Sequence, residues 1–211
     1  GLRACRDYQP PKTPTGEGAC QAFSAGAAVL YPKIIKGSTC GGVSAVVRLT
    51  MINFFNQELA ECSGTMIAPN VVLTAAHCLT ELGAAIAAVE VAGGGRRIRS
   101  SVFYAHPGVN ERADHVEVND IGLVLLPQEL AVPVMPLLNA YDFTPGEQAA
   151  IAGYGTTEYH AAEGLRAGFM WLAAASQESL IAVYNGDGSN TCVGDSGGPL
   201  AVKRGASWYL A

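Results

Sequence analysis

Short apolar segments separated by turn residues run from residue 34 to the end of the chain. In some of them apolar and polar side chains alternate, and others are continuous apolar runs bounded by Gly or Pro. Alternation with a period of two is typical of half-buried strands, and short bounded runs are typical of buried ones. We therefore predict strands at Ser44–Met51, Cys62–Ile67, Val71–Thr74, Ala85–Val91, Ile98–Tyr104, Gly122–Leu126, Gln148–Gly153, Phe169–Ala174, Leu180–Tyr184, Pro199–Val202 and Ser207–Leu210.

Many short strands at this spacing predict an all-β fold of antiparallel strands, a sandwich or a barrel. The segment Ala84–Ala88 has helical propensity, but Val89 and Val91 extend it into three consecutive glycines, which favours a strand and a hairpin turn. The chain has 211 residues, of which 49% are hydrophobic, and this is enough apolar material for a sizeable core.

Residues 1–33 have a different texture, with few periodic apolar positions and two of the cysteines. Four prolines lie in this stretch, at Pro10, Pro11, Pro14 and Pro32. We predict an irregular leader that disulfides tie down, rather than a domain with its own core.

Charge and hydropathy exclude two kinds of partner. The formal net charge is −5, so there is no basic face for nucleic acid, and the arginines at 96, 97 and 99 are expected in a solvated hairpin. No apolar run approaches the roughly 20 residues that cross a bilayer, so we predict no membrane span.

Six cysteines occur without any CxxC pair, which disfavours a zinc site and favours disulfides in an oxidising compartment. The chain is therefore predicted to be secreted, into the extracellular space or a periplasm. The acidic residues Glu111, Asp114 and Glu117 beside His115 are interpreted as a solvated loop, and neither a metal nor a cofactor is expected.

Three segments carry candidate chemistry. Thr74–Cys78 (TAAHC) follows a predicted buried strand, Asn119–Val124 (NDIGLV) opens another, and Cys192–Pro199 (CVGDSGGP) is a glycine-rich turn around one serine. Each has a structural explanation when taken singly: a hydrogen-bonding histidine, a capping aspartate and a tight turn.

Together they resemble the chymotrypsin/trypsin-like serine peptidases, in which the histidine, aspartate and serine occur in the same order. The resemblance extends to Ile34–Gly37 after Lys33, to His106-Pro107 and to Gly153–Thr157, and it covers residues 34–211. It implies two six-stranded antiparallel β-barrels, over 34–135 and 136–211, with the second barrel incomplete in this chain.

The resemblance also implies a role for each matched residue. His77 is the general base and then the acid, Asp120 holds its tautomer, and Ser196 attacks the scissile carbonyl to form an acyl-enzyme. The backbone N–H groups of Gly194 and Ser196 form the oxyanion hole. Cleavage at Lys33–Ile34 frees an N-terminus at Ile34 that pairs with Asp195 and orders this turn.

Several points stay open at the level of sequence. The resemblance implies a disulfide between Cys62 and Cys78, whereas Cys5, Cys20, Cys40 and Cys192 allow more than one pairing. The first two of these could bridge each other, or either could bridge Cys40. The leader is either still uncleaved or retained by a disulfide after cleavage.

The sequence departs from the family in two places. Family members continue beyond Ala211 with further strands and a helix, so the chain is expected to be an N-terminal part, whose remainder could be a second chain. The specificity-pocket floor corresponds to Asn190, followed by Thr191, and this neutral pair lacks the aspartate with which trypsin-like enzymes select basic residues.

The resulting functional hypothesis is a secreted serine endopeptidase, made as a zymogen and activated at Lys33–Ile34. Its expected partners are a protein or peptide substrate and an activating protease. The alternative is a catalytically silent trypsin-like protein that binds a partner.

Overall fold

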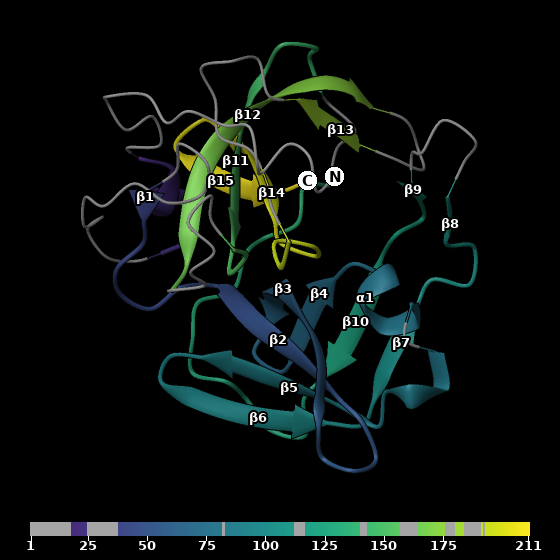
Figure 1. Ribbon diagram of the computed structural model, residues 1–211. Helices are drawn as coiled ribbons and strands as arrows, with labels where there is room; N and C mark the ends of the chain where they lie inside the picture. Colours follow the sequence, from purple (N-terminus) through teal and green to yellow (C-terminus); the bar gives the residue numbers. More distant parts are fainter. Residues whose placement is uncertain are drawn as a thin grey trace.

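Two curled antiparallel sheets make up the fold, with the first in the lower part of Figure 1 and the second in the upper part. The all-β prediction is therefore confirmed. The computed structural model describes residues 18–24, 38–81, 83–111, 117–139, 143–156, 164–175, 180–183, 191 and 193–211.

The first sheet has seven strands in the order β6-β5-β2-β3-β4-β10-β7. Their bounds are β2 (Val46–Ile52), β3 (Glu58–Ala68), β4 (Val71–Thr74), β5 (Ala88–Gly93), β6 (Arg96–Ser100), β7 (Phe103–Ala105) and β10 (Gly122–Leu125). The predicted strand Ile98–Tyr104 is divided into β6 and β7, because the Ser100 hydroxyl accepts a hydrogen bond from the Val102 N–H and turns the chain. This division explains seven strands where the family resemblance implied six.

The second sheet has six strands in the described residues. Five follow the order β1-β12-β11-β14-β15 and β13 pairs with β12; the bounds are β1 (Ser38–Thr39), β11 (Gln148–Gly153), β12 (Arg166–Ala175), β13 (Leu180–Val183), β14 (Leu200–Arg204) and β15 (Ser207–Leu210). A separate two-stranded ribbon joins β8 (Asn110–Glu111) to β9 (Glu117–Val118).

The helical elements are single turns: α1 (His77–Thr80), η1 (Ala19–Ala22) and η2 (Gly83–Ala85). Within the described residues, none of them has the length and apolar character to cross a membrane.

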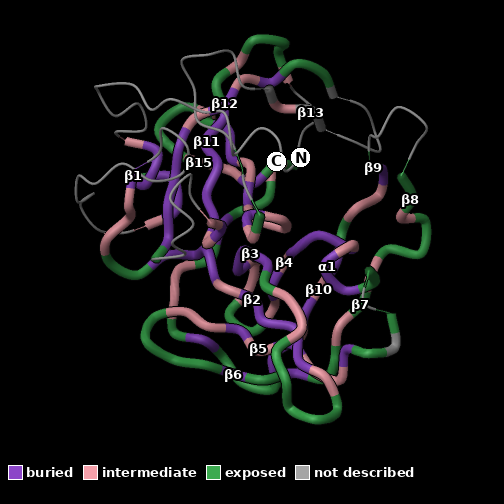
Figure 2. The backbone as a smooth tube through the Cα atoms, in the orientation of Figure 1, coloured by how far each residue is buried: buried purple, intermediate pink, exposed green. Residues whose placement is uncertain are grey.

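Alternation along the strands fills the first sheet's core. On β2, Val47, Leu49 and Met51 are fully buried, whereas Arg48 between them is partly exposed and Thr50 is 7% exposed. Alternation places Val89 and Val91 of β5 in the same core, and Figure 2 marks buried residues on these strands. Branched and long aliphatic side chains therefore dominate the first core.

Small side chains dominate the second core, which includes Ala150, Ala152, Ala167 and Ala201. The segment 18–24 supplies one of its larger groups, since the Phe23 side chain is only 2% exposed and packs there. A further link holds this segment: a disulfide joins Cys20 to Cys40, one of the pairings that the sequence left open.

Candidate active site

The register of two paired strands brings His77 and Asp120 together. β4 ends at Thr74, and its antiparallel partner β10 begins at Gly122, directly opposite Thr74. The chain leaves β4 towards α1, whose first residue is His77, and it enters β10 from Asp120. Figure 1 shows α1 and β10 beside β4, and the two side chains meet at this end of the strand pair.

Two hydrogen bonds join these residues. The His77 Nδ1 atom lies 2.7 Å from Asp120 Oδ2, and the His77 main-chain N–H donates to Oδ1 at 2.8 Å. A carboxylate in this position fixes the imidazole orientation and favours the tautomer with the proton on Nδ1. The Nε2 atom is then the ring nitrogen that can accept a proton.

The pKa values of the pair follow from this contact. The hydrogen bond with Asp120 raises the pKa of His77 against the opposing effect of burial, and the charges of Asp120, Glu117 and Glu81 add to the rise. Burial disfavours the charged form of Asp120, but hydrogen bonds from the His77 ring and main chain together lower its pKa. The pair is therefore stabilised as imidazolium and carboxylate.

A second carboxylate lies beside the ring. Glu117 Oε2 is 3.5 Å from His77 Nδ1, although the Glu117 side chain is still 45% exposed. Burial, followed by the adjacent Asp120 carboxyl, raises the pKa of Glu117. The interpretation of Glu117 as part of a solvated loop is thus incomplete, because Glu117 lies on β9 close to His77. Its position three residues before Asp120 was the feature of the sequence that could have indicated this proximity.

Ser196 lies in a turn that is bound to the first sheet through Ser63 of β3. The Ser63 N–H donates to the Ser196 carbonyl at 2.8 Å, and its hydroxyl donates to the Gly194 carbonyl at 2.9 Å. The same hydroxyl accepts the Tyr154 N–H at 2.9 Å. Ser63 is fully buried, and sequence reasoning missed it because it belongs to none of the three motifs.

In the part of the chain that the structure describes, the backbone N–H groups of Gly194 and Ser196 have no hydrogen-bond acceptor. Gly194 has a φ of 92°, a conformation that side chains disfavour. Gly197 has a φ of 75° and packs so closely that an added Cβ would lie 2.1 Å from Thr74 Oγ1. The turn therefore requires glycine at both positions.

His77 and Ser196 are not hydrogen-bonded to each other in the part of the chain that the structure describes. The recorded contact of His77 Nε2 is with the Cys78 sulfur, at 3.8 Å. Such contacts are often long in free enzymes and tighten when substrate binds.

Asp195 is 7% exposed, and its Oδ1 atom accepts the Gly155 N–H at 2.8 Å. Lys33 and Ile34, its expected activation partner, lie outside the described residues, as do Asn190, Cys5 and Cys192. Thr191 is described and exposed. A disulfide joins Cys62 to Cys78 beside the candidate base.

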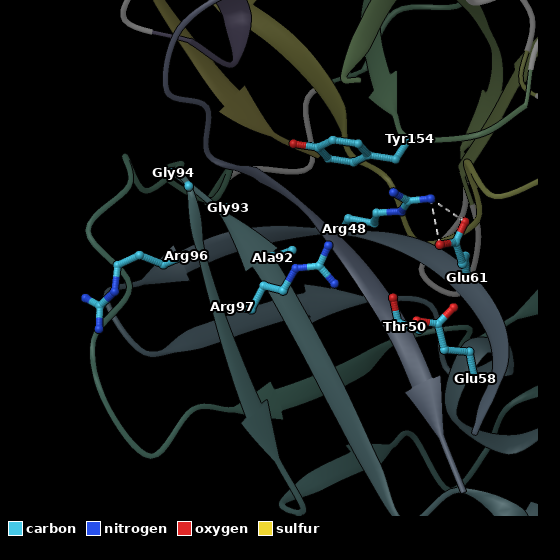
Figure 3. Close-up of a pocket in the computed structure, with 11 residues that line it drawn as sticks. Arg48, Thr50, Glu58, Glu61, Ala92, Gly93, Gly94, Arg96, Arg97 and Tyr154 are labelled. Carbon is cyan, nitrogen blue, oxygen red and sulfur yellow. Dashed lines mark hydrogen bonds and ion pairs between the residues drawn. The ribbon is translucent and has the colours of Figure 1, made fainter. Parts of the chain in front are cut away.

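A cavity of about 560 Å³ lies beside the first sheet, lined by residues of β2, β3, β5 and β6 and by Tyr154. Figure 3 shows Arg48 and Arg97 extending into it, with Tyr154 along one side. Arg48 is paired with Glu61, and Arg97 with Glu90, so much of the charge is already neutralised. Arg48, which lines this cavity, lies opposite Ser63 in the β2–β3 register.

Comparisons with known proteins identify the family of this chain. The model of the family described as Trypsin matches residues 34–210. Trypsin alpha of Drosophila melanogaster is 28% identical over 163 residues, which cover 66% of this chain and 62% of that protein. A trypsin of Saccharopolyspora erythraea is 27% identical over 166 residues, covering 68% of this chain and 71% of the relative.

Among solved structures, HL collagenase superposes with a TM-score of 0.62 at 19% identity, covering 74% of each chain. This likeness supports the fold. The match to the fly trypsin spans less than two thirds of that relative's length.

Proposed function

Because this chain belongs to the trypsin family of serine peptidases, we propose that it hydrolyses peptide bonds through Ser196, His77 and Asp120. The observation that carries the proposal is the 2.7 Å contact between His77 Nδ1 and Asp120 Oδ2. A serine hydroxyl is almost fully protonated at neutral pH and needs a base, and an oriented neutral imidazole supplies one.

The reaction begins when His77 Nε2 accepts the Ser196 proton as Oγ attacks the substrate carbonyl carbon. The imidazolium that forms is stabilised by Asp120, and the negative charge moves to the carbonyl oxygen. The N–H groups of Gly194 and Ser196 are the donors proposed to bind that oxygen, and losing one such donor raises the barrier by about 3 kcal/mol. His77 then protonates the leaving amine, and water hydrolyses the acyl-enzyme.

Activation is proposed to require cleavage at Lys33–Ile34. The new Ile34 ammonium would pair with the Asp195 carboxylate, a buried group for which a cationic partner is favourable. The Gly155 N–H already binds one oxygen of this carboxylate, so an ammonium would be a further partner and not a replacement. Secretion fits this proposal, since the described cysteines form disulfides.

The substrate is proposed to be a protein or peptide cut after an uncharged side chain, because Asn190 and Thr191 offer no carboxylate for a basic one. A peptide library cleaved by the activated protein tests this. Cleavage mainly after Lys or Arg would contradict it.

A fluorophosphonate probe tests the activity itself. The protein is treated with the probe before and after cleavage at Lys33, with Ser196→Ala as the control for site-specific labelling. Labelling of Ser196 that follows cleavage supports a zymogen, and Ile34→Gly should weaken it sharply. A folded, cleaved protein that the probe does not label would instead indicate the catalytically silent binding protein.

A further inference from the structure

The candidate base lies in a cluster of three potential metal ligands. His77, Glu117 and Asp120 each offer a ligand atom, and these atoms all lie within 4.8 Å of one another. Asp120 Oδ2 and Glu117 Oε2 are 2.7 Å and 3.5 Å from His77 Nδ1. Peptide hydrolysis as proposed above assigns Glu117 no step, so its place beside the ring is unexplained by that chemistry.

A second group of potential metal ligands, formed by Cys62, His77 and Cys78, is not suited to bind a metal. Both of its sulfur atoms are joined in one disulfide and have no thiolate to offer a metal. The carboxylate cluster is thus the only one of the two with available ligands.

The donor set and spacing fit a zinc-like cation. Zinc sites with an open coordination position commonly use three protein ligands drawn from imidazole and carboxylate groups. Bond lengths near 2.1 Å in a tetrahedron separate two ligand atoms by about 3.4 Å. The distance from His77 Nδ1 to Glu117 Oε2 matches, whereas Asp120 Oδ2 would have to withdraw by about 0.7 Å from its 2.7 Å hydrogen bond.

The cluster is open to solvent on one side. The side chains of His77 and Asp120 are 20% and 17% exposed, and that of Glu117 is 45% exposed. An ion can therefore reach the site past Glu117 and keep water as its fourth ligand. Two carboxylates beside a single imidazole also give the cluster the negative charge that a divalent cation offsets.

We propose that His77 Nδ1, Asp120 and Glu117 form an inhibitory site for a divalent cation of the zinc type. The inhibitory effect rests on the proposed peptidase function, whereas binding of the cation does not. A metal on Nδ1 requires the proton of the neutral ring to reside on Nε2. That atom then cannot accept the Ser196 proton, and Asp120 no longer accepts the Nδ1 proton, so the base is switched off while the metal is bound.

Two measurements on the cleaved full chain test this at about pH 8, which is above the ordinary imidazole pKa of about 6.5. Calorimetric titration with zinc chloride measures binding, and the rate of fluorophosphonate labelling measures inhibition. The wild type is expected to bind one zinc ion and to label at least roughly tenfold more slowly when saturated. Magnesium, which prefers six oxygen ligands, should have no such effect.

Glu117→Gln is the decisive variant, because it removes a ligand and keeps the size of the side chain. It should weaken zinc binding by at least about tenfold and make labelling correspondingly insensitive to zinc, each variant being compared with its own zinc-free rate. Glu81→Gln is the matched control, since Glu81 acts on His77 through its charge but lies outside the cluster. It should behave as the wild type.

Two results would overturn the proposal: no zinc binding by the wild type at millimolar concentration, or equal zinc sensitivity of wild type and Glu117→Gln. A protein that the probe does not label even without zinc would refute the proposed function instead. The titration of the wild type and Glu117→Gln would still decide whether the metal site exists.

Discussion

The two halves of the candidate active site are held by different kinds of contact. His77 and Asp120 lie at one end of the first sheet, beside its paired strands β4 and β10, and they bind each other directly. The turn that carries Ser196 leads into β14 of the second sheet, yet two of its carbonyl groups are bound by Ser63 of the first.

This difference has a mechanical consequence. The base half, His77 with Asp120, depends on the integrity of the first sheet. The nucleophile half, the turn that carries Ser196, depends on how the two sheets pack against each other. The two cores also differ in composition, since long aliphatic side chains fill the first and alanines fill much of the second. Residues from the segment 18–24 also fill the second core, and the Cys20–Cys40 disulfide links this segment to residue 40.

Asp120→Asn tests the base half and should have the largest effect. It keeps the side-chain volume but removes the charge and favours the wrong tautomer of His77, so labelling and hydrolysis should fall by about 10⁴-fold. The melting temperature, measured in parallel, should change little by comparison. A loss of less than tenfold would show that the base does not depend on this contact.

Phe23→Ala and Leu49→Ala test the comparison of the two cores. Each removes a large side chain that is at most 2% exposed, and each should cost about 3 kcal/mol of unfolding free energy. Hydrogen exchange should show β11, β12 and β14 losing protection first in Phe23→Ala, and β2 and β5 losing it first in Leu49→Ala. Identical exchange patterns would mean that the two sheets open as one unit.

Ser63→Ala tests the contact between the sheets. It removes the donor to the Gly194 carbonyl and the acceptor for Tyr154, so the Ser196 turn should lose its alignment and label about 10- to 100-fold more slowly. Ser100→Ala is a matched control, because Ser100 is also buried in the first sheet but binds only within it. Equal labelling rates in the two variants would contradict the coupling.

The sequence predicted β2 and β5 because their apolar residues stand out: β2 is a nearly continuous buried run, and in β5 buried and partly buried residues alternate up to Val91. It did not predict β1 or β9, which contain two residues each and carry no measurable period. It also missed the earlier start of β3 at Glu58, because Glu58 and Glu61 interrupt the apolar pattern there.

For the site, the motifs identified His77, Asp120 and Ser196 by residue type and order, but not their contacts. Ser63 was missed because its role depends on a partner 131 residues away, and no local pattern encodes that pairing. Glu117 was missed for the opposite reason, since an acidic residue in a polar segment has an ordinary explanation in solvent until the fold turns it towards a histidine.

The smallest expected effect concerns the pH at which the base half becomes active. The hydrogen bond from Asp120, together with the charges of Glu117 and Glu81, raises the pKa of His77 above its ordinary value of 6.5. His77 accepts a proton only when neutral, so labelling should rise with pH through a midpoint above 6.5.

The imidazolium of His77 is less stable when one neighbouring negative charge is removed, and the pKa of His77 is then lower. Glu117→Gln should therefore move the midpoint to lower pH and increase the relative activity near pH 6. Glu81→Gln should shift it in the same direction by less, because its charge contributes least, and Glu58→Gln on the hairpin of the first sheet should not shift it. Labelling rates between about pH 5 and pH 9 measure these midpoints. A midpoint that moves upward in Glu117→Gln would show that this carboxylate acts on the ring by something other than its charge.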